Sequence, residues 1–162
     1  MGYKIRKMEW QDWNEVSKIY KEGIESGRAT FEVKVPDYLS WNNGHLEICR
    51  FVAVDLNNKV IGWIALSPTS SRYVYRGVAE VSIYISNEYK KRNIGFYLLE
   101  KLIEESERNG IWTLESSIFE INEASIRLHE KCGFRKVGFR EKLGCDKNGV
   151  WQNTVLMERR KR

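Results

Sequence analysis

The sequence predicts an α/β fold of the mixed α+β kind, in which a central mixed β-sheet is flanked by helices. Segments rich in β-branched and aromatic residues alternate with segments whose apolar residues recur at helical spacing. Turn residues of the Asn, Asp and Gly types separate two pairs of strand-like segments, which indicates hairpins. Such a chain buries the apolar stripe of each helix against a face of the sheet.

The first half of the chain is predicted to contain a strand, two helices and a hairpin. In order, we expect a strand at residues 5–8, a helix that begins at Asp12 and includes Ile24, a short helix at 36–41, and strands at 48–54 and 60–66. Asp55, Asn57 and Asn58 separate the last two strands, so these two strands form the hairpin.

The second half is predicted to contain two helices within a series of strands. In order, we expect a strand at 78–86, a helix that follows Gly95 and closes at Asn109 and Gly110, a strand at 111–118, a helix capped by Asn122 that ends at Gly133, and strands at 134–143 and 150–158. The last two strands surround the turn sequence DKNG, which is typical of a hairpin.

Length and composition favour one domain that spans residues 1–162. The chain has 162 residues, only 2 prolines and no Ser/Gly-rich linker or repeat. The first residues lack the apolar stretch of a signal peptide, and no segment approaches the length of a membrane span. We therefore expect a soluble, cytoplasmic protein with no membrane partner. The 3 cysteines have no CxxC spacing, so they predict neither a disulfide framework nor a metal site.

The net charge of +5 leaves two interpretations open. A basic nucleic-acid-binding module is one, and the C-terminal ERRKR sequence is consistent with it. Solvated charges at the end of the chain are the other. The remaining lysines cluster before a helix and do not form a stripe with exposed aromatic residues, which argues against nucleic acid as a partner.

A basic loop lies between the predicted strand 78–86 and the helix after Gly95. Its sequence, YKKRNIGF, places Lys90, Lys91 and Arg92 just before a helix N-terminus. A helix N-terminus carries unpaired N–H groups and a partial positive charge, so such a loop can cradle a pyrophosphate. A tight turn with solvated lysines explains the same residues equally well.

The loop resembles motif A of the GCN5-related N-acetyltransferase (GNAT) family, in which the pattern Gln/Arg-x-x-Gly-x-Gly/Ala binds the pyrophosphate of acetyl-CoA. Lys90 replaces Gln or Arg here, and Asn93 replaces the first glycine. Asn tolerates a positive φ better than other non-glycine residues do. The segments GRATFE, AEVSIYI, NEASIRLHEKCGFRKVG and DKNGVWQNTVLM further resemble the phosphinothricin N-acetyltransferase-like branch of this family.

The resemblance implies a GNAT acyl-CoA N-acyltransferase fold, an enzyme, and acetyl-CoA as the acetyl donor. It places the catalytic base at Glu80 and a group that acts on the leaving thiolate, as an acid or by orienting it, at His129. An ordinary surface carboxylate and a helical packing histidine are the alternatives. The cofactor-binding residues that it implies are Ile83, Tyr84, Ile85, Lys90, Lys91, Arg92, Asn93, Ile94, Gly95, Phe96, Asn122 and Ser125, although Asn122 is also explained as a plain N-cap.

The implied acceptor is a small molecule with a primary amine, in the class of phosphinothricin, methionine sulfoximine or a related L-amino acid. The candidate substrate-binding residues are Arg28, Thr30, Phe31, Glu32, Arg72 and Tyr75. An arginine can pair in a bidentate way with the carboxylate of such an acceptor. A peptide N-terminus, a polyamine or an antibiotic remains the alternative acceptor on the same scaffold. Relatives in this branch also imply a homodimer, with Trp151 on its apolar surface.

Overall fold

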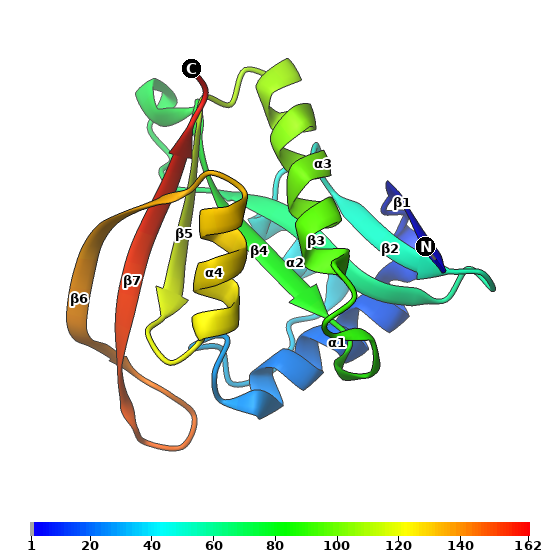
Figure 1. Cartoon of the computed structure of the whole chain (residues 1–162), viewed down its shortest axis with the longest axis horizontal. Helices are drawn as coiled ribbons and strands as arrows, with labels where there is room; N and C mark the ends of the chain where they lie inside the picture. Colours follow the sequence, from blue (N-terminus) through cyan, green and yellow to red (C-terminus); the bar gives the residue numbers. More distant parts are fainter. Residues whose placement is uncertain (1) are drawn as a thin grey trace.

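The computed structural model describes residues 2–162, which form a seven-stranded sheet with four α-helices (Figure 1). The strands are β1 (Tyr3–Lys7), β2 (Phe51–Asp55), β3 (Val60–Pro68), β4 (Val78–Ile85), β5 (Thr113–Phe119), β6 (Arg135–Cys145) and β7 (Trp151–Arg160). The helices are α1 (Trp13–Ser26), α2 (Tyr38–Gly44), α3 (Ile94–Arg108) and α4 (Glu123–Lys131). No helix in this range is long and apolar enough to cross a membrane.

The sheet has the strand order β1-β2-β3-β4-β5-β7-β6, and only the central β4–β5 contact is parallel. The mixed sheet that the sequence predicts is therefore confirmed. Strands β1 to β4 form an antiparallel meander, because short turns connect β2 to β3 and a longer loop connects β3 to β4. Strands β5, β7 and β6 form a second antiparallel unit, with β6 at the edge.

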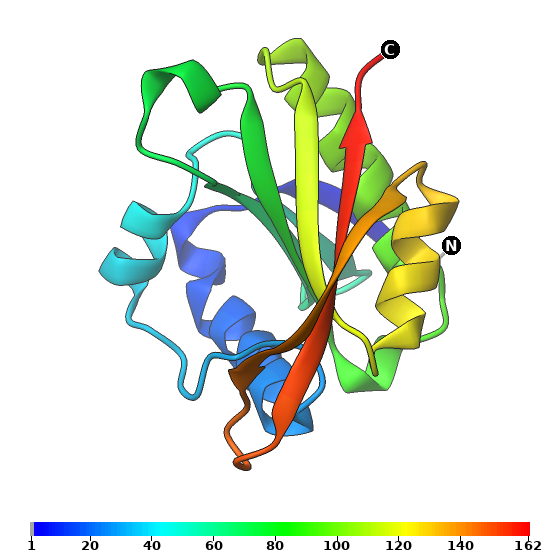
Figure 2. The same cartoon turned by 90° about the vertical axis from the view of Figure 1, so that its left-hand side faces the viewer.

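The two faces of the sheet are covered by different helices, as Figures 1 and 2 show. Helices α3 and α4 lie on one face, where Leu98 and Leu102 of α3 pack in one cluster with Ile64 of β3. Helices α1 and α2 lie on the other face, where Val16 of α1 joins a cluster with Trp63 of β3. Residues of one strand thus alternate between two separate cores.

Strands β4 and β5 pair over a short length only. Their register joins Val78 to Thr113, Ala79 to Leu114 and Glu80 to Glu115, and no pair follows the last of these. In Figure 1 the two strands lie together at their start and diverge towards their carboxyl ends. A wedge therefore opens in the middle of the sheet, directly after Glu80 and Glu115.

The predicted elements all occur, and the largest boundary differences are three residues, at the start of β2 and at the end of α2. The expected strand 48–54 begins only at Phe51, because Cys49 has a φ of 62° and interrupts extended backbone. The expectation that Gly95 precedes its helix is also corrected, since α3 begins at Ile94. Positive φ angles fall on Lys91 and Asn93 in this loop, and Gly95 lies inside the helix.

Candidate active site

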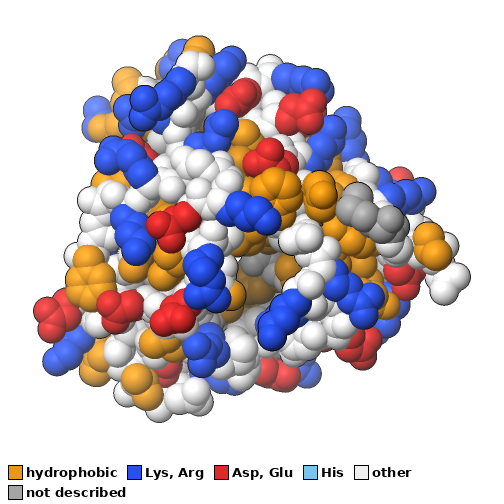
Figure 3. All heavy atoms as spheres, in the orientation of Figure 1, with side chains coloured by type: hydrophobic (Ala, Val, Ile, Leu, Met, Phe, Trp, Pro, Cys, Tyr) orange, Lys and Arg blue, Asp and Glu red, His pale blue; other side chains and the backbone are white. Residues whose placement is uncertain are grey.

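A cavity of about 790 Å³ lies where β4, α4 and the N-terminus of α3 meet. Its lining includes all twelve residues that the sequence singled out for cofactor binding: Ile83, Tyr84, Ile85, Lys90, Lys91, Arg92, Asn93, Ile94, Gly95, Phe96, Asn122 and Ser125. The C-terminal end of α1 and the residues after it also reach the cavity, through Gly23, Ser26 and Arg28. Figure 3 shows a hollow near the centre of this face, with basic side chains around it.

The loop before α3 and the first turn of that helix line this cavity. Asn93 has a φ of 63° and is the N-cap of α3, but its side chain caps no N–H group. The first intrahelical bond of the backbone runs from Tyr97 N to Asn93 O at 3.2 Å. The N–H groups of residues 94–96 precede that bond, so the helix supplies them with no acceptor. Three free N–H groups and the positive end of the helix dipole therefore favour an anion.

Basic side chains surround the cavity from two elements. Lys90, Lys91 and Arg92 are exposed on the loop, as expected from the sequence. Arg127 and Lys131 of α4 also line the cavity, and sequence reasoning missed both. Their spacing of four residues, which puts them on one face of α4, is the signal that could have identified them.

Gly95 allows α3 and α4 to approach each other closely. A Cβ atom at this position would lie 3.0 Å from Leu128 Cδ2 of α4 and 3.8 Å from Ile83 Cδ1 of β4. Leu128 and Ile83 both line the cavity, so a larger residue would push against its wall. The small size of Gly95, and not its conformational freedom, is what this position requires.

The part of β4 that lines the cavity has no strand beside it on one edge. Residues 81–85 pair with β3, but their other edge faces the wedge where β5 has moved away. Extended backbone alternates its N–H and C=O groups between the two edges, so this stretch presents free donors and acceptors to the cavity. Ile83, Tyr84 and Ile85 are therefore placed to bind an extended ligand that carries amide groups.

Helix α4 borders the cavity at its N-terminal end. Asn122 accepts a hydrogen bond from Ser125 N at 3.3 Å and so acts as the N-cap, while both residues also line the cavity. The two roles that the sequence offered for Asn122 are thus compatible in one geometry.

His129 lies one turn beyond Ser125 and is 1% exposed. Nδ1 lies 2.7 Å from the carbonyl oxygen of Ser125, which can only accept, so Nδ1 carries the proton. Nε2 then accepts from Ser116 Oγ of β5 at 2.9 Å. Burial lowers the pKa of this ring, which keeps it neutral. Because both ring nitrogens are occupied, the geometry favours the orienting role over the acid role for His129.

Glu80 is placed at the apex of the wedge, on the face opposite α3 and α4. Its neighbours Ala79 and Val81 point into the core under α3, so the Glu80 side chain projects towards the α1 face. The carboxylate reaches solvent, yet the concave surroundings desolvate it and raise its pKa, and the charge of Glu115 raises that pKa further. A carboxylate with a raised pKa is a stronger base than an ordinary one.

The segment after α1 lies over this same face. Thr30 and Glu32 both act on the pKa of Tyr84 of β4, which burial, the largest cause, raises. Phe31 packs on Phe119 of β5 with ring centroids 4.5 Å apart. Arg28 donates to the carbonyl oxygen of Ile121 at 2.8 Å, which ties the segment to the turn before α4.

Arg72 and Tyr75 lie in the loop between β3 and β4, outside the lining of the cavity. They contact each other, since the Arg72 guanidinium lies 5.5 Å from the centre of the Tyr75 ring. Both side chains are exposed. The structure thus presents them as a pair, and their contact with an acceptor stays a prediction.

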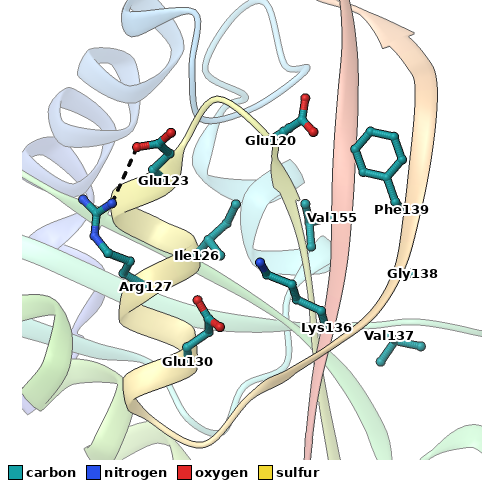
Figure 4. Close-up of a pocket in the computed structure, with 10 residues that line it drawn as sticks. All are labelled: Glu120, Glu123, Ile126, Arg127, Glu130, Lys136, Val137, Gly138, Phe139 and Val155. Atoms are coloured by element: carbon teal, nitrogen blue, oxygen red, sulfur yellow. Dashed lines mark ion pairs between the residues drawn. The ribbon is translucent and has the colours of Figure 1, made fainter.

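A second hollow, of about 610 Å³, lies between α4 and strands β6 and β7 (Figure 4). Three carboxylates and two basic side chains line it together with Ile126 and Val155, and Glu123 pairs with Arg127 at 3.6 Å across one turn of α4. Within residues 2–162, no group of His, Cys, Asp or Glu side chains is arranged to hold a metal ion.

Comparison with known proteins identifies the class to which this fold and cavity belong. The family described as "Acetyltransferase (GNAT) family" matches residues 5–134, so the chain belongs to the GNAT acetyltransferases. A crystal structure of a GNAT superfamily phosphinothricin acetyltransferase from Sinorhizobium meliloti in complex with AcCoA superposes with a TM-score of 0.88 at 30% identity, over 99% of this chain and 89% of the other. The GNAT fold that the sequence predicts is thereby confirmed.

Two relatives are similar in sequence as well. The putative phosphinothricin acetyltransferase YwnH of Bacillus subtilis is 35% identical over 83% of this chain and 85% of its own length. An L-methionine sulfoximine/L-methionine sulfone acetyltransferase of Pseudomonas paraeruginosa is 30% identical over 66% of this chain and 62% of its own length. The chain therefore resembles acetyltransferases that are named for amino-acid-like acceptors.

The positive φ of Asn93 gives a test of the loop. We expect Asn93→Gly to keep the acetyl-CoA dissociation constant within about twofold, because glycine adopts this φ without strain. Asn93→Val should weaken binding by roughly tenfold, since a β-branched residue at φ near 63° costs about 1–2 kcal/mol and shifts the N–H groups. Isothermal titration calorimetry measures the acetyl-CoA dissociation constant of both variants.

Asn58→Val is the matched control, because Asn58 has a φ of 62° in the β2–β3 turn, outside the cavity lining. It should lower the free energy of unfolding without changing acetyl-CoA binding. Unchanged binding in Asn93→Val would show that the loop does not hold the cofactor.

Proposed function

We propose that the protein transfers an acetyl group from acetyl-CoA to the primary amine of a small amino-acid-like acceptor, such as phosphinothricin, methionine sulfoximine or a related L-amino acid. The observation that carries this proposal is the wedge between β4 and β5. Its cavity joins an anion-binding helix N-terminus to a free strand edge, and its apex carries Glu80. The residues present therefore fit acetyl-CoA, which has a pyrophosphate and an amide-bearing arm.

In this proposal acetyl-CoA supplies the thioester. The chain binds and orients acetyl-CoA, and it deprotonates the acceptor amine. The N–H groups of residues 94–96 and the basic loop hold the pyrophosphate, and the free edge of β4 aligns the pantetheine arm. A backbone N–H in the stretch Ile83 to Ile85 polarises the thioester carbonyl. Glu80 accepts a proton from the acceptor ammonium, directly or through a water, and so generates the free amine that attacks the thioester.

His129 supports this site without giving up a proton. Its bonds to Ser116 and to the Ser125 carbonyl hold α4 against β5. The ring therefore fixes the position of α4 against β5, which forms one side of the wedge, and the leaving thiolate takes its proton from another donor.

The acceptor is proposed from the names of the relatives and from the residues near Glu80. Arg72 would pair with the carboxylate or phosphinate of an amino-acid-like acceptor, with Tyr75 beside it. Arg28, Thr30, Phe31 and Glu32 would form the opposite wall. Acetylation of a peptide N-terminus, polyamine or antibiotic is the second candidate, because the scaffold is shared while acceptors differ.

A thiol-release assay with acetyl-CoA and a panel of amines tests the proposed function. We expect turnover with at least one amino-acid-like amine and none with DNA or tRNA. The panel pairs each amino acid with its decarboxylated amine, so that a requirement for the carboxylate is visible. Turnover of the decarboxylated amines alone would contradict the amino-acid-like acceptor, and no turnover with any amine would contradict the function.

Replacing Glu80 tests the base. Glu80→Gln keeps the shape of the side chain but removes the proton acceptor, so we expect the rate constant to fall by roughly 10² to 10⁴ at pH 7 with acetyl-CoA binding nearly unchanged. The deficit should shrink as the pH rises, because the free amine then forms without the enzyme. Steady-state kinetics between pH 6 and 10 measure it, and wild-type turnover of the variant at pH 7 would exclude Glu80 from the reaction.

We also propose that residues 1–162 act as a single domain in a cytoplasmic homodimer. Acetyl-CoA is available in the cytoplasm, and the three cysteines are all free. The edge strand β6 and its partner β7 expose an apolar surface that consists of Val137, Phe139, Leu143, Val150 and Trp151. Figure 4 shows Val137 and Phe139 beside the hollow on β6. A second copy of the chain would cover this surface.

Light scattering tests the assembly. We expect a mass of twice the 19.1 kDa of one chain at micromolar concentration. Phe139→Glu should give the mass of one chain, because a charge on this surface opposes its burial, whereas Leu56→Glu in the exposed β2–β3 turn should leave the dimer intact. A single-chain mass for the unaltered protein would contradict the dimer.

A further inference from the structure

Glu80 has a second carboxylate directly beside it. Glu80 and Glu115 are the last register partners of β4 and β5 before the strands diverge. Partners across neighbouring strands point to the same face, and their backbones lie roughly 5 Å apart. Leu114 packs in the core under α3, so Glu115 projects to the opposite face together with Glu80.

The row of carboxylates continues onto β7, but the third one is neutralised. Glu158 is the register partner of Glu115, and it pairs with Arg135 at 2.7 Å and with Arg160 at 3.7 Å. Among the described residues 2–162, neither Glu80 nor Glu115 forms an ion pair with a basic side chain. The apex of the wedge therefore holds two neighbouring acidic groups without a protein counter-charge.

We propose that Glu115 is a positioning residue for the reaction, whose fixed negative charge keeps Glu80 a stronger base and draws the acceptor ammonium to the apex. This inference rests on the proposed role of Glu80 as the base. Glu115 is also the functional residue that sequence reasoning missed at this end of the site.

The surroundings of Glu80 single out Glu115 as the charge that acts on it. Desolvation is the largest cause of the raised pKa of Glu80, and the charge of Glu115 is the second. On β3 the register partner is the uncharged Ser67, and on β4 itself the same face carries Tyr84, which stays neutral because burial raises its pKa. Glu32, in the segment after α1, acts on the pKa of Tyr84, and its charge is not among the causes of the raised pKa of Glu80.

The proton balance of the step is simple. One N–H bond of the acceptor ammonium breaks, and its proton forms an O–H bond with the Glu80 carboxylate. The nitrogen lone pair that is freed then attacks the thioester carbon, and the C–S bond breaks towards the thiolate. A second proton leaves the same nitrogen as the neutral amide forms, and it balances the proton that the thiolate takes up to become the thiol of CoA. Glu80 returns its proton to solvent after the transfer. Glu115 acts through its charge and forms or breaks no bond in this step.

The titration of Glu80 tests this role in the free enzyme. In ¹³C NMR of protein labelled at the glutamate carboxyl carbons, with Glu80→Gln used to assign the resonance, we expect the midpoint of Glu80 to move to lower pH in Glu115→Gln. Glu115→Asp keeps the charge, so the midpoint of Glu80 in this variant should stay near its value in the unaltered protein. Glu130→Gln removes an exposed carboxylate of α4 that does not line the cavity, and should leave the midpoint unchanged. Equal midpoints in the unaltered protein and Glu115→Gln would overturn the proposal.

Kinetics with the acceptor found in the amine panel provide the second readout. In Glu115→Gln, the acid limb of kcat/KM should move to lower pH, and kcat/KM at pH 7.5 should fall about two- to fivefold, with part of the loss in the KM of the amine. The acetyl-CoA dissociation constant should not change. If the unaltered enzyme and Glu115→Gln are both active and their pH profiles of kcat/KM superimpose, the role of Glu115 is overturned and the proposed function remains intact. A complete lack of acetyl transfer by the unaltered enzyme would overturn both.

Discussion

The separation of β4 from β5 after three register pairs is the constraint on which the site depends. Strand β4 remains paired with β3 from Ala79 to Ile85, and β5 remains paired with β7 over its whole length. Each half of the sheet therefore keeps its own hydrogen-bond ladder, and only the inner edges lose partners. An unpaired backbone group costs about 1–3 kcal/mol where water is excluded, so a ligand with amide groups gains by replacing the missing strand.

Two sets of contacts hold these inner edges apart. On the β4 side, Tyr84 stacks on Tyr20 of α1 and on Trp63 of β3 with ring centroids 5.0 Å apart in both cases, which anchors β4 to both elements. Such aromatic pairs contribute roughly 0.5–1.5 kcal/mol each beyond their buried area. On the β5 side, His129 joins Ser116 to α4. The wedge is thus a property of packing on both faces of the sheet.

The elements of the fold could be predicted from the sequence because their signals are local. Periodicity, the Asn122 cap and the turn residues all act within a few positions, and the resemblance to GNAT motifs predicted the loop before α3 as the cofactor loop. Glu115 and the end of β4–β5 pairing could not be predicted, since the register of two parallel strands joined by a helix depends on distant packing. The occupied ring nitrogens of His129 were hidden for the same reason: Ser116 lies on another element.

The basic loop and Glu80 lie at opposite ends of the site. The distance between them explains how one end can attract an anion while the other keeps a carboxylate with a raised pKa. Extended backbone rises about 3.3 Å per residue, so Glu80 and the end of β4 at Ile85 lie roughly 16 Å apart, and the basic loop begins beyond that point. This separation exceeds the screening length of about 8 Å at physiological ionic strength. The basic loop can therefore attract an anionic cofactor without lowering the pKa of Glu80, and no basic residue is among the causes of its shift. The excess of basic residues is then compatible with the proposed role of Glu80 as a base, because the sheet keeps the basic loop far from Glu80.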